Sequence, residues 1–254
     1  MLADDIHVRG RLIILEARGQ LKTSPNPTLE KYANELEEWL AADGGYSGEK
    51  GFSTIGPWIL YELQDMTDAV YLQMDAWAFG VIKNLKGKYV DIGSKLDYIS
   101  MIGQILPVEF VDVRPLKSEL EGVISKVGKG EAMPYEDSSV DVVSCLHAAE
   151  HFGLGRYGDD LDPMGTEKAC TEFERIVKPG GSIVFAVPAG PPCIQFNAHR
   201  IFSKQMVLDM FPGCDVKEEL FMDGKSPNPC AEGSLVMNVA IGESGLYGVH
   251  LVKR

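Results

Sequence analysis

KYVDIG, at residues 88–93, decides the fold, since it is a short apolar run that ends in an acid and a glycine. Similar runs follow at EFVDV (109–113), VDVVSCL (140–146) and SIVFAV (182–187). None of them alternates cleanly between polar and apolar residues, which is typical of strands covered on both faces. A helix is expected at Thr166–Val177, where KPGG supplies a stop signal directly before the next strand. This rhythm predicts an α/β fold with a doubly wound, mostly parallel sheet.

Further strands complete the predicted sheet. One is expected just before Glu131, and two late apolar runs lie at Leu235–Ile241 and Tyr247–Val252. A short helix, SKQMVLDMF (203–211), is expected between the fifth strand and these late runs. Together the runs predict seven strands.

The residues upstream of the sheet are expected to be helical. Leu29–Ala42 places its apolar residues on one helical face, and a second helix is expected over about residues 61–83. We therefore predict an N-terminal helical extension or cap at residues 1–86, followed by the sheet domain at residues 87–254.

Composition narrows the classes of function. The chain has 254 residues, with 37 acidic against 24 basic side chains and a net charge of -13, which argues against a nucleic-acid surface. No apolar run reaches the roughly 18 residues that span a bilayer, and MLADDIHVRGR lacks the layout of a signal peptide. The five cysteines form no CxxC pair, so neither a disulfide framework nor a zinc site is indicated. A cytoplasmic protein is expected.

Polar residues gather where the predicted strands end. Ligands in such sheets bind outside the carboxyl ends of the strands. The first strand ends in Asp91, Gly93 and Ser94, and the second ends in Asp112, 21 positions after Asp91. A carboxylate about 20 residues beyond a glycine turn is typical of sites that bind ribose hydroxyls. Because no GxGxxG is present, a nicotinamide cofactor is disfavoured.

Four motifs carry a resemblance to class I S-adenosylmethionine-dependent methyltransferases, over about residues 88–187. They are VDIGS, FVDVRP, GEAMPYEDSSVDVV and RIVKPGGSIVFAVP. More narrowly, VDIGSKLD, SCLHAAEHFGLGRYGDDLDPMG, FNAHRIFS and YGVHLVK resemble an uncharacterised methyltransferase-like family that accompanies sugar and surface-polysaccharide genes. The resemblance implies a Rossmann-like methyltransferase that binds S-adenosyl-L-methionine.

The resemblance also implies roles for particular residues. At the methionine end of the cofactor it implies Asp91, Gly93 and Ser94; at the ribose, Asp112 and Val113; at the adenine, Glu131 and Ala132; and near the methyl group, Leu146 and His147. One departure stands out, because DIGSKLDYI has Lys95, Leu96 and Asp97 where further glycines are expected. Fewer glycines leave less backbone access to a ligand.

Three histidines are candidates for catalysis. Methyl transfer to a hydroxyl needs an aligned acceptor and a base, and a histidine near neutral pKa suits that task. His147 and His151 rank first as the base, followed by His199. The cluster Glu150, Asp159, Asp160 and Asp162 leaves open a divalent metal such as magnesium, although the aspartates also suit a turn and a helix start. We do not favour a metal.

The loops after the fourth and fifth strands are expected to bind the acceptor. Arg156 and Tyr157 lie in a glycine-hinged loop, where the arginine suits a phosphate or carboxylate, and Asn197 and Arg200 lie in the second wall. The expected function is O-methylation of a sugar, a glycan precursor or a small hydroxylated metabolite. The alternative is a non-catalytic or nucleotide-sugar-binding protein on the same fold, and a homodimer is left open.

Overall fold

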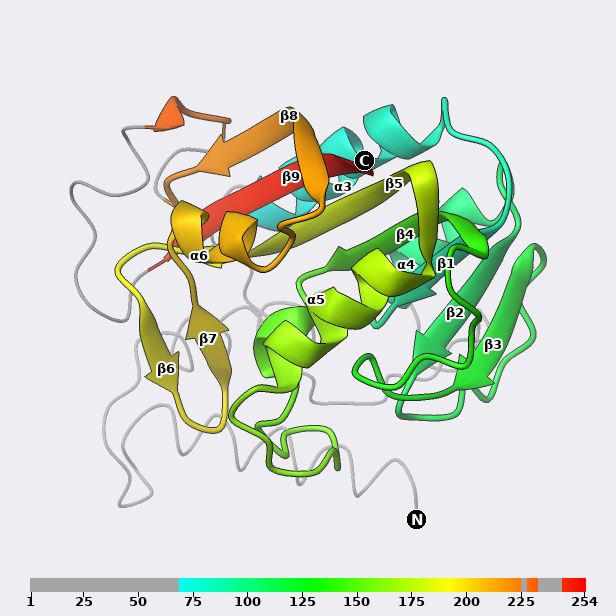
Figure 1. Cartoon of the computed structure of the whole chain (residues 1–254), viewed down its shortest axis with the longest axis horizontal. Coiled ribbons are helices and arrows are strands. Elements are labelled where there is room, and N and C mark those ends of the chain that lie inside the picture. Colours follow the sequence, from blue (N-terminus) through cyan, green and yellow to red (C-terminus); the bar gives the residue numbers. More distant parts are fainter. Residues whose placement is uncertain (1–68, 225–227, 233–243) are drawn as a thin grey trace, which may run out of the picture. The chain divides into compact units, whose positions relative to one another are not determined.

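The structure, a computed structural model, describes residues 69–224, 228–232 and 244–254 (Figure 1). In the described residues, a seven-stranded sheet has the order β3-β2-β1-β4-β5-β9-β8. β1 to β4 pair in parallel, as do β4 and β5, whereas β9 runs antiparallel to both β5 and β8. The strands are β1 (Tyr89–Ile92), β2 (Val108–Asp112), β3 (Val123–Val127), β4 (Val140–Leu146), β5 (Val177–Ala189), β8 (Cys214–Met222) and β9 (Gly245–Lys253). The prediction of a mostly parallel, seven-stranded sheet is confirmed.

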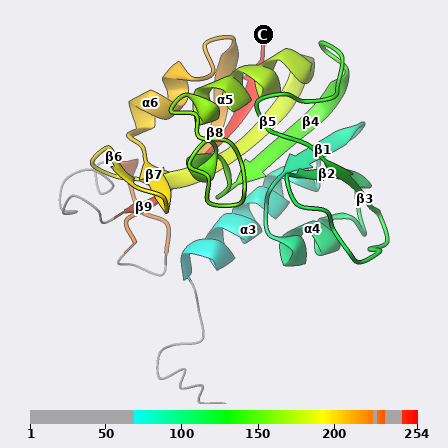
Figure 2. The ribbon, with the colours of Figure 1, turned by 90° about the horizontal axis from the view of Figure 1, so that it is seen from below.

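Helices cover both faces of the sheet (Figure 2). α3 (Ala69–Ile82) and α4 (Leu96–Ile102) lie on one face, and α5 (Gly165–Ile176) and α6 (Lys204–Asp209) lie on the other. A short 3₁₀ turn, η1 (Ala149–His151), follows β4. β6 (Cys193–Gln195) and β7 (His199–Ile201) form a separate hairpin after β5. No helix in the described ranges is long and apolar enough to cross a membrane.

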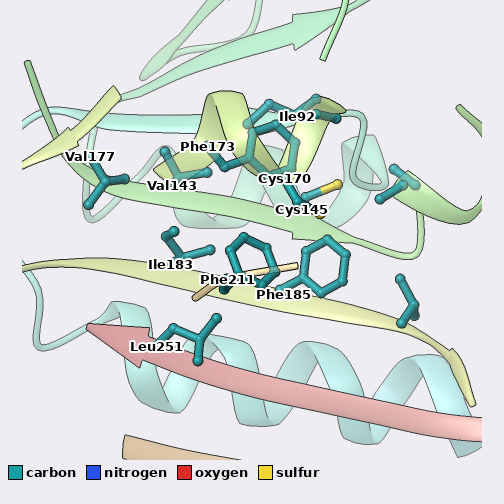
Figure 3. Close-up of a cluster of buried hydrophobic side chains, with 14 of the residues drawn as sticks. Ile92, Val143, Cys145, Cys170, Phe173, Val177, Ile183, Phe185, Phe211 and Leu251 are labelled. Atoms are coloured by element: carbon teal, nitrogen blue, oxygen red, sulfur yellow. The ribbon is translucent and has the colours of Figure 1, made fainter. Parts of the chain in front are cut away.

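The two cores follow from the alternation of side chains along the central strands. Val143 and Cys145 of β4 face α5 and pack with Phe173 (Figure 3). Val142 and Leu146 face α3 and α4 instead. All of these side chains are almost fully buried. Each large apolar side chain buried in this way contributes about 1.5–3 kcal/mol. This packing on both faces holds the central strands in place and so fixes the positions of the residues at their carboxyl ends.

Some expected elements differ from the observed ones. α5 ends at Ile176, and KPGG (178–181) begins β5 instead of preceding it. β8 is a strand that the sequence does not predict, because its first half is charged and exposed. α3 lies within the predicted cap and packs on the sheet. The expected helix at Leu29–Ala42, the rest of the cap up to residue 68 and the run Leu235–Ile241 lie outside the described residues.

Candidate active site

A cavity of about 670 Å³ lies at the carboxyl ends of the parallel strands. Its walls come from the β1–α4 turn, the segment after β2, the loop after β4, and β7. A smaller cavity of about 70 Å³ shares several of these wall residues, among them Gly93, Asp112 and His147. This is the position at which open α/β sheets bind their ligands.

Most of the predicted site residues line these two cavities. The larger one is lined by Gly93, Ser94, Asp112, His147, His151, Arg156, Tyr157 and His199. Val113 and Glu131 line the smaller one. The predicted residues outside both linings are Asp91, Ala132, Leu146, Asn197 and Arg200. The structure thus brings together ten of the predicted side chains from loops far apart in sequence.

The end of β1 is built around the buried carboxylate of Asp91. Its oxygens accept from the Ser94 amide (3.1 Å) and hydroxyl (2.7 Å) and from the Ser144 hydroxyl. The Ser94 hydroxyl in turn accepts from the Leu146 amide at 3.1 Å, which ties the β1 turn to the end of β4. Burial raises the pKa of Asp91 to about 7, although these hydrogen bonds oppose the shift. Side-chain hydrogen bonds therefore hold the turn in which Gly93 alone has a positive φ, 69°.

The end of β2 carries a carboxylate that is already paired. Both oxygens of Asp112 accept from the guanidinium of Arg114, at 2.9 and 2.8 Å. The Asp112 side chain is 9% exposed, and the Arg114 side chain is 56% exposed. Arg114 also lies over the ring of Tyr157, 4.5 Å from its centroid, and so connects this strand end to the loop after β4.

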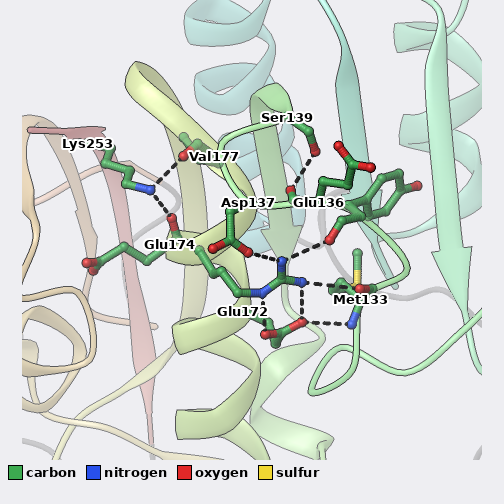
Figure 4. Close-up of polar contacts among 10 residues, drawn as sticks. Met133, Glu136, Asp137, Ser139, Glu172, Glu174, Val177 and Lys253 are labelled. Carbon is green, nitrogen blue, oxygen red and sulfur yellow. Dashed lines mark hydrogen bonds and ion pairs between the residues drawn. The ribbon is translucent and has the colours of Figure 1, made fainter.

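The segment that carries Glu131 and Ala132 is held at Met133 by Arg175 and Glu172 of α5. Figure 4 shows Glu172 beside Met133. Arg175 donates to Glu172 at 2.7 Å, to Asp137 at 2.7 Å and to the Met133 carbonyl at 3.3 Å. Glu172 returns a contact by accepting from the Met133 amide at 3.0 Å. These bonds fix the position of the segment beside the smaller cavity.

The end of β4 holds the pair formed by His147 and Glu150. His147 adopts φ 52°, a left-handed conformation that is uncommon outside glycine and marks local strain. Its Nδ1 lies 3.0 Å from Oε1 of Glu150, whose side chain is 1% exposed. Burial by itself would raise the pKa of Glu150, but His147 and then His151 hold that pKa below its ordinary value. Nε2 of His147 and Oε2 of Glu150 are buried and have no hydrogen-bond partner among the described residues.

His151 lies beside this pair in a more crowded setting. Its Nδ1 is 2.6 Å from the Ala198 carbonyl oxygen, and its Nε2 is 3.7 Å from Oε1 of Glu150. The rings of His151 and His199 are 6.4 Å apart. Burial lowers the pKa of His151, and the nearby Arg156 lowers it further, whereas Glu150 and the Ala198 carbonyl oppose the shift. The structure thus places all three predicted histidines at one wall of the cavity.

The aspartates of the loop after β4 hold that loop in place through hydrogen bonds and ion pairs. Asp159 accepts from the amides of Gly153 (2.8 Å), Gly155 (3.2 Å) and Tyr157 (3.1 Å). Asp160 pairs with Lys129, and Asp162 pairs with Lys168 and accepts from the Met164 amide. No group of His, Cys, Asp and Glu in the described ranges is arranged to hold a metal. Each of these aspartates thus has a structural partner.

Arg200 and Asn197 were predicted to line the acceptor site, but neither lies in the cavity wall. Arg200 is 5% exposed and donates to the carbonyl oxygens of Phe152 (2.6 Å) and Pro163 (3.3 Å). It thereby holds the loop after β4 through that loop's own carbonyl oxygens. Asn197 lies exposed in the turn of the β6–β7 hairpin.

Sequence reasoning missed part of the wall. Glu150 was weighed only as a metal ligand, although its spacing of three from His147 is the local signal for a paired side chain. Lys95 and Lys117 also line the cavity. No sequence pattern marks these lysines, because exposed lysines are common everywhere.

Solved structures of low identity share this fold. A protein of Galdieria sulphuraria, provisionally assigned as a sarcosine dimethylglycine methyltransferase, superposes with a TM-score of 0.53 at 13% identity, covering 84% of this chain and 96% of its own. Geranyl diphosphate C-methyltransferase from Streptomyces coelicolor A3(2) superposes with a TM-score of 0.51 at 13% identity, covering 70% of this chain and 78% of its own. The chain therefore has the fold of the class I S-adenosylmethionine-dependent methyltransferases.

The chain belongs to the family described as "Caenorhabditis protein of unknown function, DUF268", whose model matches residues 103–229, half of the chain. An uncharacterised methyltransferase of Schizosaccharomyces pombe is 29% identical over 134 residues. That match covers 46% of this chain and 47% of the yeast protein, so the chain spans about half the length of the curated relative it matches. The family region contains Asp112, His147 and the loop after β4.

Proposed function

We propose that this protein is an S-adenosylmethionine-dependent methyltransferase that methylates an oxygen of a sugar, a glycan precursor or a related small hydroxylated metabolite. The observation that carries the proposal is the His147–Glu150 pair at the wall of the strand-end cavity. A histidine oriented by a buried carboxylate is the arrangement that general-base catalysis uses. The sugar-like acceptor comes from the resemblance to the sugar-associated family.

The residues at the strand ends fit the proposed cofactor. Gly93 and Ser94 would receive its methionine end, the Asp112 carboxylate its ribose hydroxyls, and Glu131 its adenine. The Asp112 carboxylate fits because it stands at the cavity wall, and a carboxylate has more lone pairs than Arg114 occupies. When bound, the sulfonium supplies the methyl group. Asp91 supports this end from within, as a positioning residue that holds Ser94.

His147 is the proposed base. Donation of its Nδ1 proton to Glu150 would leave Nε2 as the acceptor nitrogen, and Nε2 has no partner within the described protein. A ligand hydroxyl is the kind of group that satisfies such an orphaned atom. Because the pKa of Glu150 is lowered, its carboxylate stays charged and stabilises the imidazolium that forms.

His151 is less suited to be the base. The Ala198 carbonyl at 2.6 Å accepts the proton of its Nδ1, so Nε2 is left facing a carboxylate oxygen of Glu150 at 3.7 Å. We therefore assign His151 and His199 to the acceptor wall beside the base. Arg156 and Tyr157 complete that wall, with Arg200 as the residue that positions their loop.

The Arg114–Asp112 ion pair favours a second candidate. Both Asp112 oxygens are engaged, so a protein that has lost its cofactor and binds a nucleotide-sugar without methylating it would show the same pair. The two candidates differ in their affinity for the cofactor.

Isothermal titration with S-adenosylmethionine and S-adenosylhomocysteine separates the candidates. We expect both ligands to bind, and Asp112→Asn to weaken S-adenosylhomocysteine by about 10- to 100-fold, because charge-assisted hydrogen bonds to the ribose are lost. Asp215→Asn, an exposed aspartate on β8, is the matched control and should bind like the wild type. If neither ligand binds, the methyltransferase proposal is wrong. If the two variants bind S-adenosylhomocysteine equally well, Asp112 does not contact the cofactor.

A further inference from the structure

The cavity carries an excess of positive charge within an acidic chain. Four basic side chains line it, namely Lys95, Arg114, Lys117 and Arg156, against the two carboxylates Asp112 and Glu150. Arg114 neutralises Asp112, and Glu150 is buried against His147. Among the described residues, Lys95, Lys117 and Arg156 have no carboxylate partner. Because the whole chain has a net charge of -13, this local excess is a specific feature of the cavity.

Arg156 is the best placed of the three cations. One nitrogen of its guanidinium donates to the Ala198 carbonyl at 2.9 Å and lies 3.5 Å from Nδ1 of His151. It therefore bridges the loop after β4 and the β6–β7 hairpin on the histidine wall. A guanidinium has five N–H donors, so after the bond to the Ala198 carbonyl donors remain for an anion, whether a planar carboxylate or a tetrahedral phosphate.

We infer that the methyl acceptor carries a phosphate or carboxylate group, and that Arg156 binds that anion at the histidine wall, while Lys117 adds positive charge to the same cavity. The inference rests on the proposed function and adds the charge class of its substrate. Lys95 is left with the cofactor end, because it directly follows Ser94 and its ammonium group lies 3.0 Å from the centroid of the Tyr71 ring. An anion held by Arg156 would bring an attached hydroxyl toward His147 and His151, which line the same cavity.

Small probes test the inference on the full chain, with and without saturating S-adenosylhomocysteine. The probes for calorimetric titration are inorganic pyrophosphate, glucose 1-phosphate and glucuronate, with glucose as the neutral control. We expect an anion to bind where glucose does not, and its affinity to fall as salt is raised. The two phosphate probes and glucuronate distinguish a phosphate site from a carboxylate site.

Two matched variants locate the anion. Arg156→Gln should weaken the bound anion by at least about tenfold, because a charge-assisted contact is lost. Lys86→Gln removes one exposed charge away from the cavity and should have no effect. Anions that bind no better than glucose would overturn the inference, as would equal affinities of the two variants. A loss of S-adenosylhomocysteine affinity in Arg156→Gln, with anion affinity retained, would assign the arginine to the cofactor and overturn it as well.

The same titrations separate this inference from the proposed function. If S-adenosylhomocysteine does not bind, the proposed methyl transfer is wrong. Anion binding that depends on Arg156 would still support an anionic ligand. If S-adenosylhomocysteine binds and none of the anions does, the proposed methyl transfer stands and the anionic acceptor is ruled out.

Discussion

Two buried carboxylates stand at the ends of the neighbouring strands β1 and β4, and their partners differ. Asp91 is surrounded by hydroxyl and amide donors, and its pKa is raised to about 7. Glu150 faces two imidazoles, and its pKa is lowered despite equally complete burial. Neutral dipoles only partly replace water around a charge, whereas a neighbouring imidazole favours the charged form of a carboxylate. The comparison shows that similar burial leaves a carboxyl held by neutral donors at one strand end and a carboxylate paired with imidazoles at the other.

The largest expected effect concerns Asp91. A raised pKa means that its contribution to stability is fully present below about pH 3.8 and is lost as the pH rises through about 7. The wild type should therefore lose on the order of 4 kcal/mol of unfolding free energy across that window, and Asp91→Asn should lose this part of the slope. Urea unfolding at a series of pH values measures it, with Asp215→Asn as control. An unchanged slope in Asp91→Asn would mean that folding does not raise the pKa of Asp91.

The next effect concerns the His147–Glu150 pair, for which stability changes with pH in the opposite direction. A lowered pKa means that the contribution of Glu150 is present above its ordinary pKa of 4.5 and is lost as the pH falls through the folded-state value. At neutral pH, His147→Asn leaves a buried charge poorly paired and should cost about 3 kcal/mol. Asparagine is chosen because it tolerates the left-handed backbone at this position. Denaturant unfolding of the single variants and of His147→Asn with Glu150→Gln gives the coupling.

The double variant decides that test. If the pair is coupled as the geometry indicates, adding Glu150→Gln should restore at least half of the stability lost in His147→Asn, because the isolated charge disappears. Strictly additive losses would show that the two side chains act independently.

The smallest expected effect is the difference between two left-handed glycines in the loop after β4. The loop after β4 uses left-handed glycines, and a β-carbon at Gly153 would collide with the carbonyl oxygen of Asp162, whereas one at Gly158 would meet open space. Gly158→Ala should cost about 1 kcal/mol from the backbone conformation alone, and Gly153→Ala should cost about 2 kcal/mol more because the loop must shift. Thermal unfolding of the two variants measures the difference. Equal costs would indicate a loop that adjusts freely.

The fold was largely readable from local patterns. Four of the expected strands overlap β1, β2, β4 and β5, since strands buried on both faces are continuous apolar runs. β8 escaped prediction because its charged, exposed residues are stabilised by pairing with β9 and carry no apolar signal of their own. The spacing of Asp112 from the first strand end also predicted its place at the cavity, because parallel strands end at one edge of the sheet.

The sequence by itself determined the sheet, the order of its strand-end acids and the gathering of histidines after β4. The tertiary structure decided what those residues face. It buried Asp91 beneath the turn, bound Arg200 to the Phe152 carbonyl 48 positions away, and joined Arg156 to Ala198 across 42 positions. Local periodicity records which face of an element is covered, but burial and charge state depend on atoms brought together from distant segments, and one sequence window does not contain them.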